Sequence, residues 1–103
     1  MTIFWTALAK LKLQEIYDYY FEEVGFEIAE KITSEIVKET LRLIDAPYIG
    51  QKELLLEEHP NNFRYLVYKN YKIIYWINEK KNRIDIANVF DCRQDPNLLK
   101  QMI

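Results

Sequence analysis

The stretch FRYLVYKNYKIIYWIN, residues 63–78, decides the fold. It is rich in Tyr, Val and Ile on both sides of Lys69-Asn70, a pattern that predicts two β-strands joined by a tight turn. A hairpin at the surface of a small domain normally has one apolar and one solvated face. Here large apolar side chains occupy both faces, and Arg64 and Lys72 are the only charges on the strands. The second face therefore needs a cover.

The length of the turn determines which side chains share a face. A two-residue turn at Lys69-Asn70 would pair Tyr68 with Tyr71, whereas a three-residue turn would pair Val67 with Tyr71. We favour the three-residue turn because Asn70 tolerates a left-handed conformation and because the apolar residues then collect on one side. That side is predicted to hold Phe63, Tyr65, Val67, Tyr71, Ile73 and Tyr75, and the opposite side Leu66, Ile74 and Trp76.

The N-terminal half predicts an edge strand at residues 2–5 and two helices. Apolar residues recur at spacings of three and four over residues 7–24 and 26–44, which is typical of amphipathic helices. Gly25 is placed as a left-handed stop between them, so that the helices form an antiparallel hairpin. Asp45-Ala46-Pro47 ends the second helix.

The remaining segments complete an α+β fold in a single domain, residues 1–103. We expect a short extended piece near residues 53–56, a turn at 59–62, a strand at 83–90, and one or two helical turns after Asp95 and Pro96. The order is β-α-α-β-β-β, with a helical hairpin packed on one face of a mainly antiparallel sheet.

Composition narrows the class of protein. The net charge of −2 disfavours direct binding of free nucleic acid, because phosphate-binding proteins usually carry a basic excess. No apolar run is long enough to span a bilayer, and the N-terminus lacks the pattern of a signal peptide. One cysteine, Cys92, fits a reducing cytoplasm. With one histidine besides, a metal site is not expected, nor is a cofactor.

Three stretches, in this order, resemble the RelE/ParE toxin family of type II toxin–antitoxin systems. They are ALAKLKLQEIYDYY at residues 7–20, FRYLVYKNYKIIYWI at 63–77, and VFDCRQDP at 89–96. The resemblance covers nearly the whole chain. It implies a small bacterial, cytoplasmic toxin that a cognate antitoxin neutralises by wrapping around it.

The family's two branches differ in their targets. RelE-like members cleave mRNA in the ribosome, and ParE-like members poison DNA gyrase. By resemblance, the cations of a nuclease would be Arg64, Lys72 and Arg93. However, Leu66 stands where the nucleases tend to have a lysine, and the C-terminal tyrosine has no counterpart. The ParE-like branch therefore fits better, with no complete active site. A ribosome-dependent endonuclease is the alternative, and an inactive toxin fold is a third possibility.

The second sheet face is the predicted interface with the antitoxin, although the C-terminal Leu98-Leu99 turn or another copy of the chain would also cover it. Trp76 is its predicted anchor, since buried aromatic residues dominate such sites. Asp91 and Arg93 are candidate contacts for the target. The residues predicted to bind the partner are Arg64, Leu66, Lys72, Ile74, Trp76, Tyr19 and Phe21.

Overall fold

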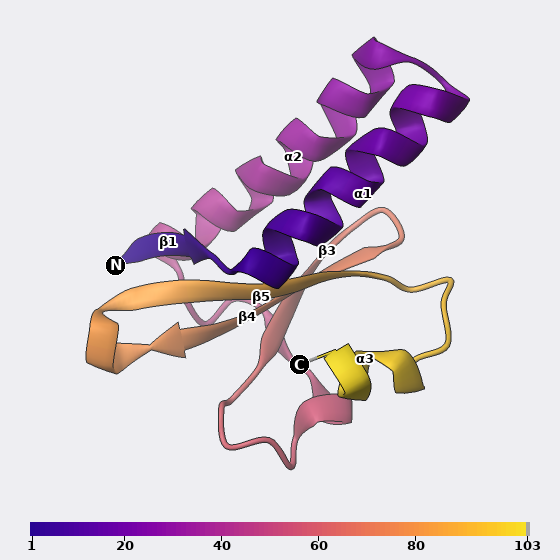
Figure 1. Ribbon diagram of the computed structural model, residues 1–103. Coiled ribbons are helices and arrows are strands. Elements are labelled where there is room, and N and C mark those ends of the chain that lie inside the picture. Colours follow the sequence, from indigo (N-terminus) through magenta and orange to yellow (C-terminus); the bar gives the residue numbers. More distant parts are fainter. Residues whose placement is uncertain (103) are drawn as a thin grey trace.

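A five-stranded sheet lies at the centre of the fold, with the strand order β1-β5-β4-β3-β2 (Figure 1). The computed structural model describes residues 1–102. Only β1 and β5 run parallel; the other neighbours are antiparallel. The predicted α+β class and mainly antiparallel sheet are confirmed. The strands are β1 Thr2–Trp5, β2 Gln51–Lys52, β3 Arg64–Tyr68, β4 Tyr71–Asn78 and β5 Arg83–Asp91.

The helical hairpin covers one face of the sheet, as predicted. It consists of α1, Ala7–Glu23, and α2, Phe26–Asp45. Thr6 fixes the start of α1, because its hydroxyl accepts from the Ala9 amide and donates to the Ile86 carbonyl on β5. Gly25 separates the helices at φ 134, a positive angle that suits glycine but lies outside the left-handed helical region predicted for it.

Two hydrophobic cores lie on opposite faces of the sheet. The second is covered by a 3-10 helix, η1 (Leu54–Leu56), and by the C-terminal helix α3, Asn97–Met102. Successive side chains of β4 point alternately into the two cores. The sequence of this strand is therefore a nearly continuous run of apolar residues. The first core includes Ala9, Ile16, Ile32, Ile36, Leu43, Leu66, Tyr71, Ile73, Tyr75, Ile84, Ile86 and Val89. The second comprises Leu56, Phe63, Ile74, Ala87, Phe90 and Leu99.

The predicted three-residue turn is wrong. Tyr68 pairs with Tyr71 and Val67 with Lys72, so that the turn has two residues, and Lys69 rather than Asn70 takes the positive φ, at 52. The slip of one residue moves Leu66 to the helix side and Phe63 to the opposite side. The prediction failed because it assumed one core, whereas this sheet has to supply apolar side chains to two.

The segment between α2 and β3 also differs from the prediction. The extended piece is β2, which lies before residue 53, and residues 54–56 form η1 instead of a strand. The Glu53 side chain caps η1 by accepting from the Leu55 amide. At the other end of the chain, Asp95 accepts from the Asn97 amide at the start of α3, as expected.

Gly50 holds the loop after α2 against the sheet. Its amide donates to the Tyr75 hydroxyl at 3.0 Å, and that hydroxyl donates to the Pro47 carbonyl at 2.7 Å. A Cβ at position 50 would lie 2.6 Å from the Tyr75 hydroxyl oxygen and 2.8 Å from the Tyr65 carbonyl oxygen. There is no room for a side chain.

We expect Gly50→Ala to lower the free energy of unfolding by about 1–3 kcal/mol, because the ring or the strand has to shift. Urea unfolding followed by circular dichroism measures it. Ser34→Ala, on the exposed side of α2, is the control and should change stability by less than about 0.5 kcal/mol. Equal stability of Gly50→Ala and the wild type would contradict the close approach.

Candidate functional site

The second sheet face is largely covered by the chain itself. Ile74 is fully buried within the second core, which also includes Leu99 of α3. Leu66 lies on the opposite face, in the core under the helices. Both predicted partner-binding residues are therefore unavailable to a partner in this structure, and the C-terminal cover is the alternative that the structure supports.

Lys72 is neutralised by a residue that the sequence did not single out. Its ammonium lies 2.8 Å from a carboxylate oxygen of Glu53, whose side chain is 3% exposed. The same ammonium lies 4.3 Å from the centre of the Tyr65 ring. A buried carboxylate needs such a partner, because removing either charge would leave the other unpaired in a poorly solvated site. Lys72 is a structural cation here.

Arg64 also makes contacts that hold the fold. Its guanidinium donates to the Gly50 carbonyl at 2.8 Å and to the Tyr48 carbonyl at 3.3 Å, and lies 5.2 Å from the centre of the Tyr48 ring. Arg64 pairs across the ladder with Tyr75, on the helix side of the sheet, whereas Lys72 lies on the other side. The predicted cationic patch of Arg64 with Lys72 is therefore not formed.

Arg64 instead lines a groove at the end of the sheet, which we call the edge groove. Strand β3 pairs with β4 only as far as Tyr75, and the following residues, Trp76–Asn78, form one wall. The groove has a volume of about 610 Å³ and contains three cations and one carboxylate. Its lining residues are Tyr48, Lys52, Pro60, Asn61, Asn62, Arg64, Trp76, Ile77, Asn78, Glu79 and Lys80. Trp76 is half-buried there.

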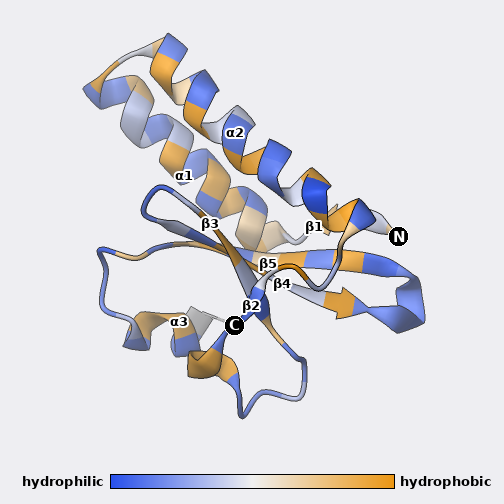
Figure 2. Ribbon diagram, turned by 180° about the vertical axis from the view of Figure 1, so that it is seen from behind, coloured by the Kyte–Doolittle hydropathy of each residue, from blue (hydrophilic) through white to orange (hydrophobic). Residues whose placement is uncertain are grey.

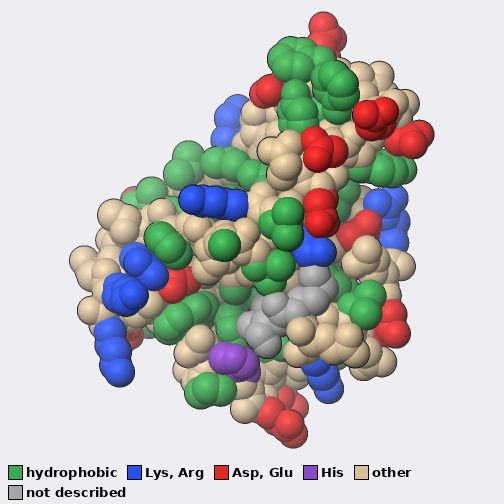
Figure 3. Space-filling model, in the orientation of Figure 1, with side chains coloured by type: hydrophobic (Ala, Val, Ile, Leu, Met, Phe, Trp, Pro, Cys, Tyr) green, Lys and Arg blue, Asp and Glu red, His purple; other side chains and the backbone are tan. Residues whose placement is uncertain are grey.

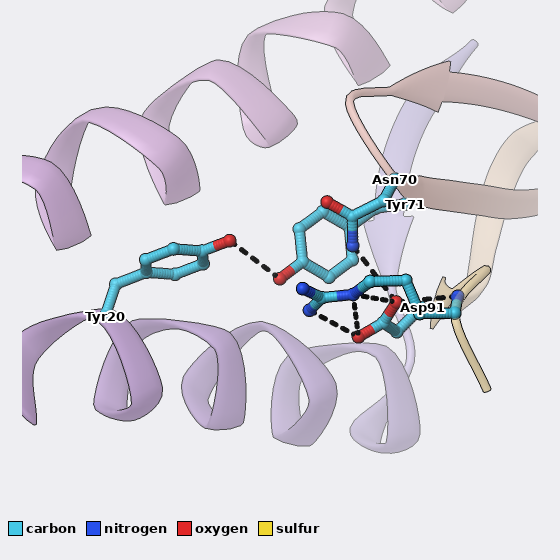
Figure 4. A network of polar contacts seen from close by, with 5 residues as sticks. Tyr20, Asn70, Tyr71 and Asp91 are labelled. Carbon is cyan, nitrogen blue, oxygen red and sulfur yellow. Dashed lines mark hydrogen bonds and ion pairs between the residues drawn. The ribbon is translucent and has the colours of Figure 1, made fainter. Parts of the chain in front are cut away.

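Asp91 and Arg93 form the second candidate site, at the end of β5 (Figure 4). The Arg93 guanidinium donates to both carboxylate oxygens of Asp91, at 3.0 and 2.8 Å, and the Arg93 amide also donates to this carboxylate. Asn70, in the β-turn, donates to it at 3.0 Å. Beside this group, the Tyr71 hydroxyl donates to Tyr20 of α1.

These contacts shift the ionisation of the group. The hydrogen bond from Arg93 is the main cause that lowers the pKa of Asp91 to about 2. The same bond raises the pKa of Arg93. Burial, followed by the hydrogen bond to Tyr20, raises the pKa of Tyr71. At neutral pH the site therefore presents an ion pair beside the neutral phenol of Tyr71.

A pocket of about 350 Å³ opens between this group and α1. Tyr19 is 52% exposed and lines it, together with Lys12 and Glu15 of the same helix. Phe21, two residues on, is not part of this pocket and instead stacks on Tyr17 with 6.0 Å between the ring centres. Tyr19 and Phe21 thus belong to different surfaces, although the sequence placed them together.

The three cations proposed for a nuclease do not meet. Arg64 lies in the edge groove, Lys72 pairs with Glu53, and Arg93 pairs with Asp91. Sequence reasoning missed Glu53, because an acid in an irregular segment normally indicates an exposed loop. It also missed Asn70, whose bond to Asp91 depends on the turn length. Neither residue has a local pattern that signals its role.

Within residues 1–102, no group of three or more His, Cys, Asp or Glu side chains is placed to hold a metal ion. The described helices include none that is long and apolar enough to cross a membrane.

Comparisons with known proteins give a family for this fold. Residues 3–96 match the family model described as "ParE toxin of type II toxin-antitoxin system, parDE". Among solved structures, the chain is similar to one from the chromosomal ParDE TA system of P. aeruginosa, with a TM-score of 0.72 and 25% sequence identity. That match covers 88% of this chain and 95% of the other. No curated protein matches the sequence.

The Asp91–Arg93 pair predicts a measurable titration. Since the folded pKa of about 2 lies below the ordinary value of 3.8, the pair stabilises the fold above about pH 4 and loses this contribution as the pH falls toward 2. In Arg93→Gln the Asp91 pKa should rise toward its ordinary value, as measured by NMR titration of the carboxyl carbon. Arg42→Gln, which breaks a helix-surface pair with Glu39, should leave it unchanged. An Asp91 pKa near 4 in the wild type would contradict the structure.

Proposed function

The chain belongs to the ParE toxin family of type II toxin–antitoxin systems, and we propose that it acts by binding DNA gyrase and is neutralised by a cognate antitoxin. Gyrase is what the resemblance to ParE-like toxins implies. On this proposal the protein works in the cytoplasm as a binding inhibitor and not as an enzyme.

The separation of the three cations is the observation that favours binding over RNA cleavage. Metal-independent cleavage needs a base, an acid and cations converging on one phosphate. Lys72 and Arg93 are each held by a carboxylate within 2.8 Å, and Arg64 donates to two backbone carbonyls. Bringing them to one phosphate would require breaking contacts that hold the fold.

We place the antitoxin in the edge groove. Its cations, Lys52, Arg64 and Lys80, line the same groove as the aromatic side chains of Tyr48 and Trp76. This combination suits an acidic segment that carries an apolar residue, because charge guides the encounter and aromatic burial supplies most of the affinity. Asp91 and Arg93 remain our candidates for a contact with the target, with Tyr19 on the opposite wall of their pocket.

We expect Trp76→Ala to weaken antitoxin binding by about 30-fold, as is typical for the truncation of an aromatic anchor. Isothermal titration calorimetry with the purified antitoxin measures it. Val67→Ala is the control, because Val67 is 57% exposed on the same hairpin but outside the groove. Thermal unfolding of both variants checks that they are folded. An unchanged affinity of folded Trp76→Ala would exclude Trp76 as the anchor.

The target is tested by adding the purified protein to two reactions in parallel. One is DNA supercoiling by gyrase, and the other is translation on programmed ribosomes, in which mRNA cleavage is mapped. We expect inhibition of supercoiling with intact mRNA, because Arg64, Lys72 and Arg93 lie apart from one another and each is already held by other groups of the fold. Cleavage of the mRNA without inhibition of gyrase would contradict this proposal and support the alternative function, a ribosome-dependent mRNA endonuclease.

A further inference from the structure

The end of the helical hairpin projects beyond the sheet. We define the hairpin tip as residues 17–30, which contain the end of α1, the turn at Gly25 and the start of α2. In both ribbon views this end lies away from the strands (Figures 1 and 2). Apart from Tyr20, no side chain of the tip belongs to or packs against the first core, and none belongs to the second.

The hairpin tip nevertheless exposes a group of large apolar side chains. Phe21 is 49% exposed, Val24 62%, Phe26 58% and Ile28 39%. Stacking on Tyr17 holds the ring of Phe21 in place. Single exposed apolar residues are normal on protein surfaces, but four within eight positions at a projecting turn form a patch, and such patches mark interaction sites. Figure 3 shows hydrophobic side chains gathered at this end, with acidic ones around them.

The charge around the patch restricts the partner. The hairpin tip carries five exposed carboxylates and no Lys or Arg, a charge of −5 in a chain whose net charge is −2, so that the remaining residues carry +3. The carboxylates belong to Asp18, Glu22, Glu23, Glu27 and Glu30. A second copy docked tip to tip would bring like charges together, and nucleic acid or an anionic membrane would be repelled.

We propose that the hairpin tip is a docking surface for a basic protein surface on the target, in which apolar pockets accept Phe21 and Phe26. The inference rests on the proposed function for the existence of a protein target. It assigns Phe21 to the target and not to the antitoxin. The tip is then a second surface for the target, in addition to the pocket beside Asp91 and Arg93. Helix α1 lines that pocket and leads from it to the tip.

Two pairs of variants test the patch and its charge. Phe21→Ser/Phe26→Ser removes the aromatic anchors, and Leu11→Ser/Leu41→Ser is matched to it, because these leucines are 54% and 52% exposed on the same two helices outside the tip. Glu22→Lys/Glu27→Lys reverses the charge, and Glu57→Lys/Glu58→Lys makes the same change on the exposed segment after η1. Thermal unfolding verifies that each variant is folded.

The readouts are inhibition of gyrase supercoiling, growth arrest on expression in bacteria, and affinity for the antitoxin. We expect both tip variants to need at least about tenfold more protein for the same inhibition, to lose growth arrest, and to bind the antitoxin normally. The two control variants should behave as the wild type in all three assays. If the wild type arrests growth without inhibiting gyrase, and the tip variants lose this growth arrest, the tip is still a docking surface, but its target is a protein other than gyrase.

Two outcomes overturn the inference. If the folded tip variants inhibit gyrase and arrest growth like the wild type, the tip does not contact the target, while the proposed function stands. If they lose antitoxin affinity but keep inhibition, the tip belongs to the antitoxin interface. A wild-type protein that neither inhibits gyrase nor arrests growth would reject the proposed function, and with it this inference.

Discussion

Strand β4 has to be buried on both faces, and most of the structure follows from this constraint. Ile73 and Tyr75 pack under the helical hairpin, whereas Ile74, between them, packs under η1 and α3. The chain therefore needs a second cover besides its helices, and it supplies this cover from the segment before β3 and from its C-terminal end. The same arrangement requires the ion pair of Lys72 with Glu53, because a lysine on a doubly covered strand needs a partner nearby.

The elements that depend on local pattern were predictable from the sequence. The helices have a period of three to four residues, and Gly25 and Pro47 mark their ends, so that their bounds differ from the predicted ones by one residue. The turn at Lys69-Asn70 was not predictable in this way. The length of the turn depends on whether the sheet packs against one core or two. The second core is formed with residues such as Leu56 and Leu99, which lie far from the turn in the sequence.

For the candidate sites, too, the sequence predicted some features and could not predict others. The sequence identified Trp76, Asp91 and Arg93, each of which lies at a groove or pocket. It could not show that Arg64 and Lys72 lie on opposite faces, because a shift of one residue in the register reverses that relation. Nor could it show that Gly50 and Tyr48 would hold the Arg64 guanidinium. Cations in such strands are predicted easily, but whether they are free is a property of the tertiary structure.

On the proposed function, the opposite charges of the edge groove and the hairpin tip bear on how an antitoxin would neutralise this protein. The edge groove carries Lys52, Arg64 and Lys80, whereas the hairpin tip is acidic. An antitoxin held only in the groove would leave the tip accessible to the target. The longest dimension of the molecule is 39 Å, which an extended chain of about 12 residues spans at roughly 3.3 Å per residue. A short continuation of an antitoxin bound in the groove would therefore be long enough to reach the tip, and to block the tip it would have to change from acidic to basic along its length.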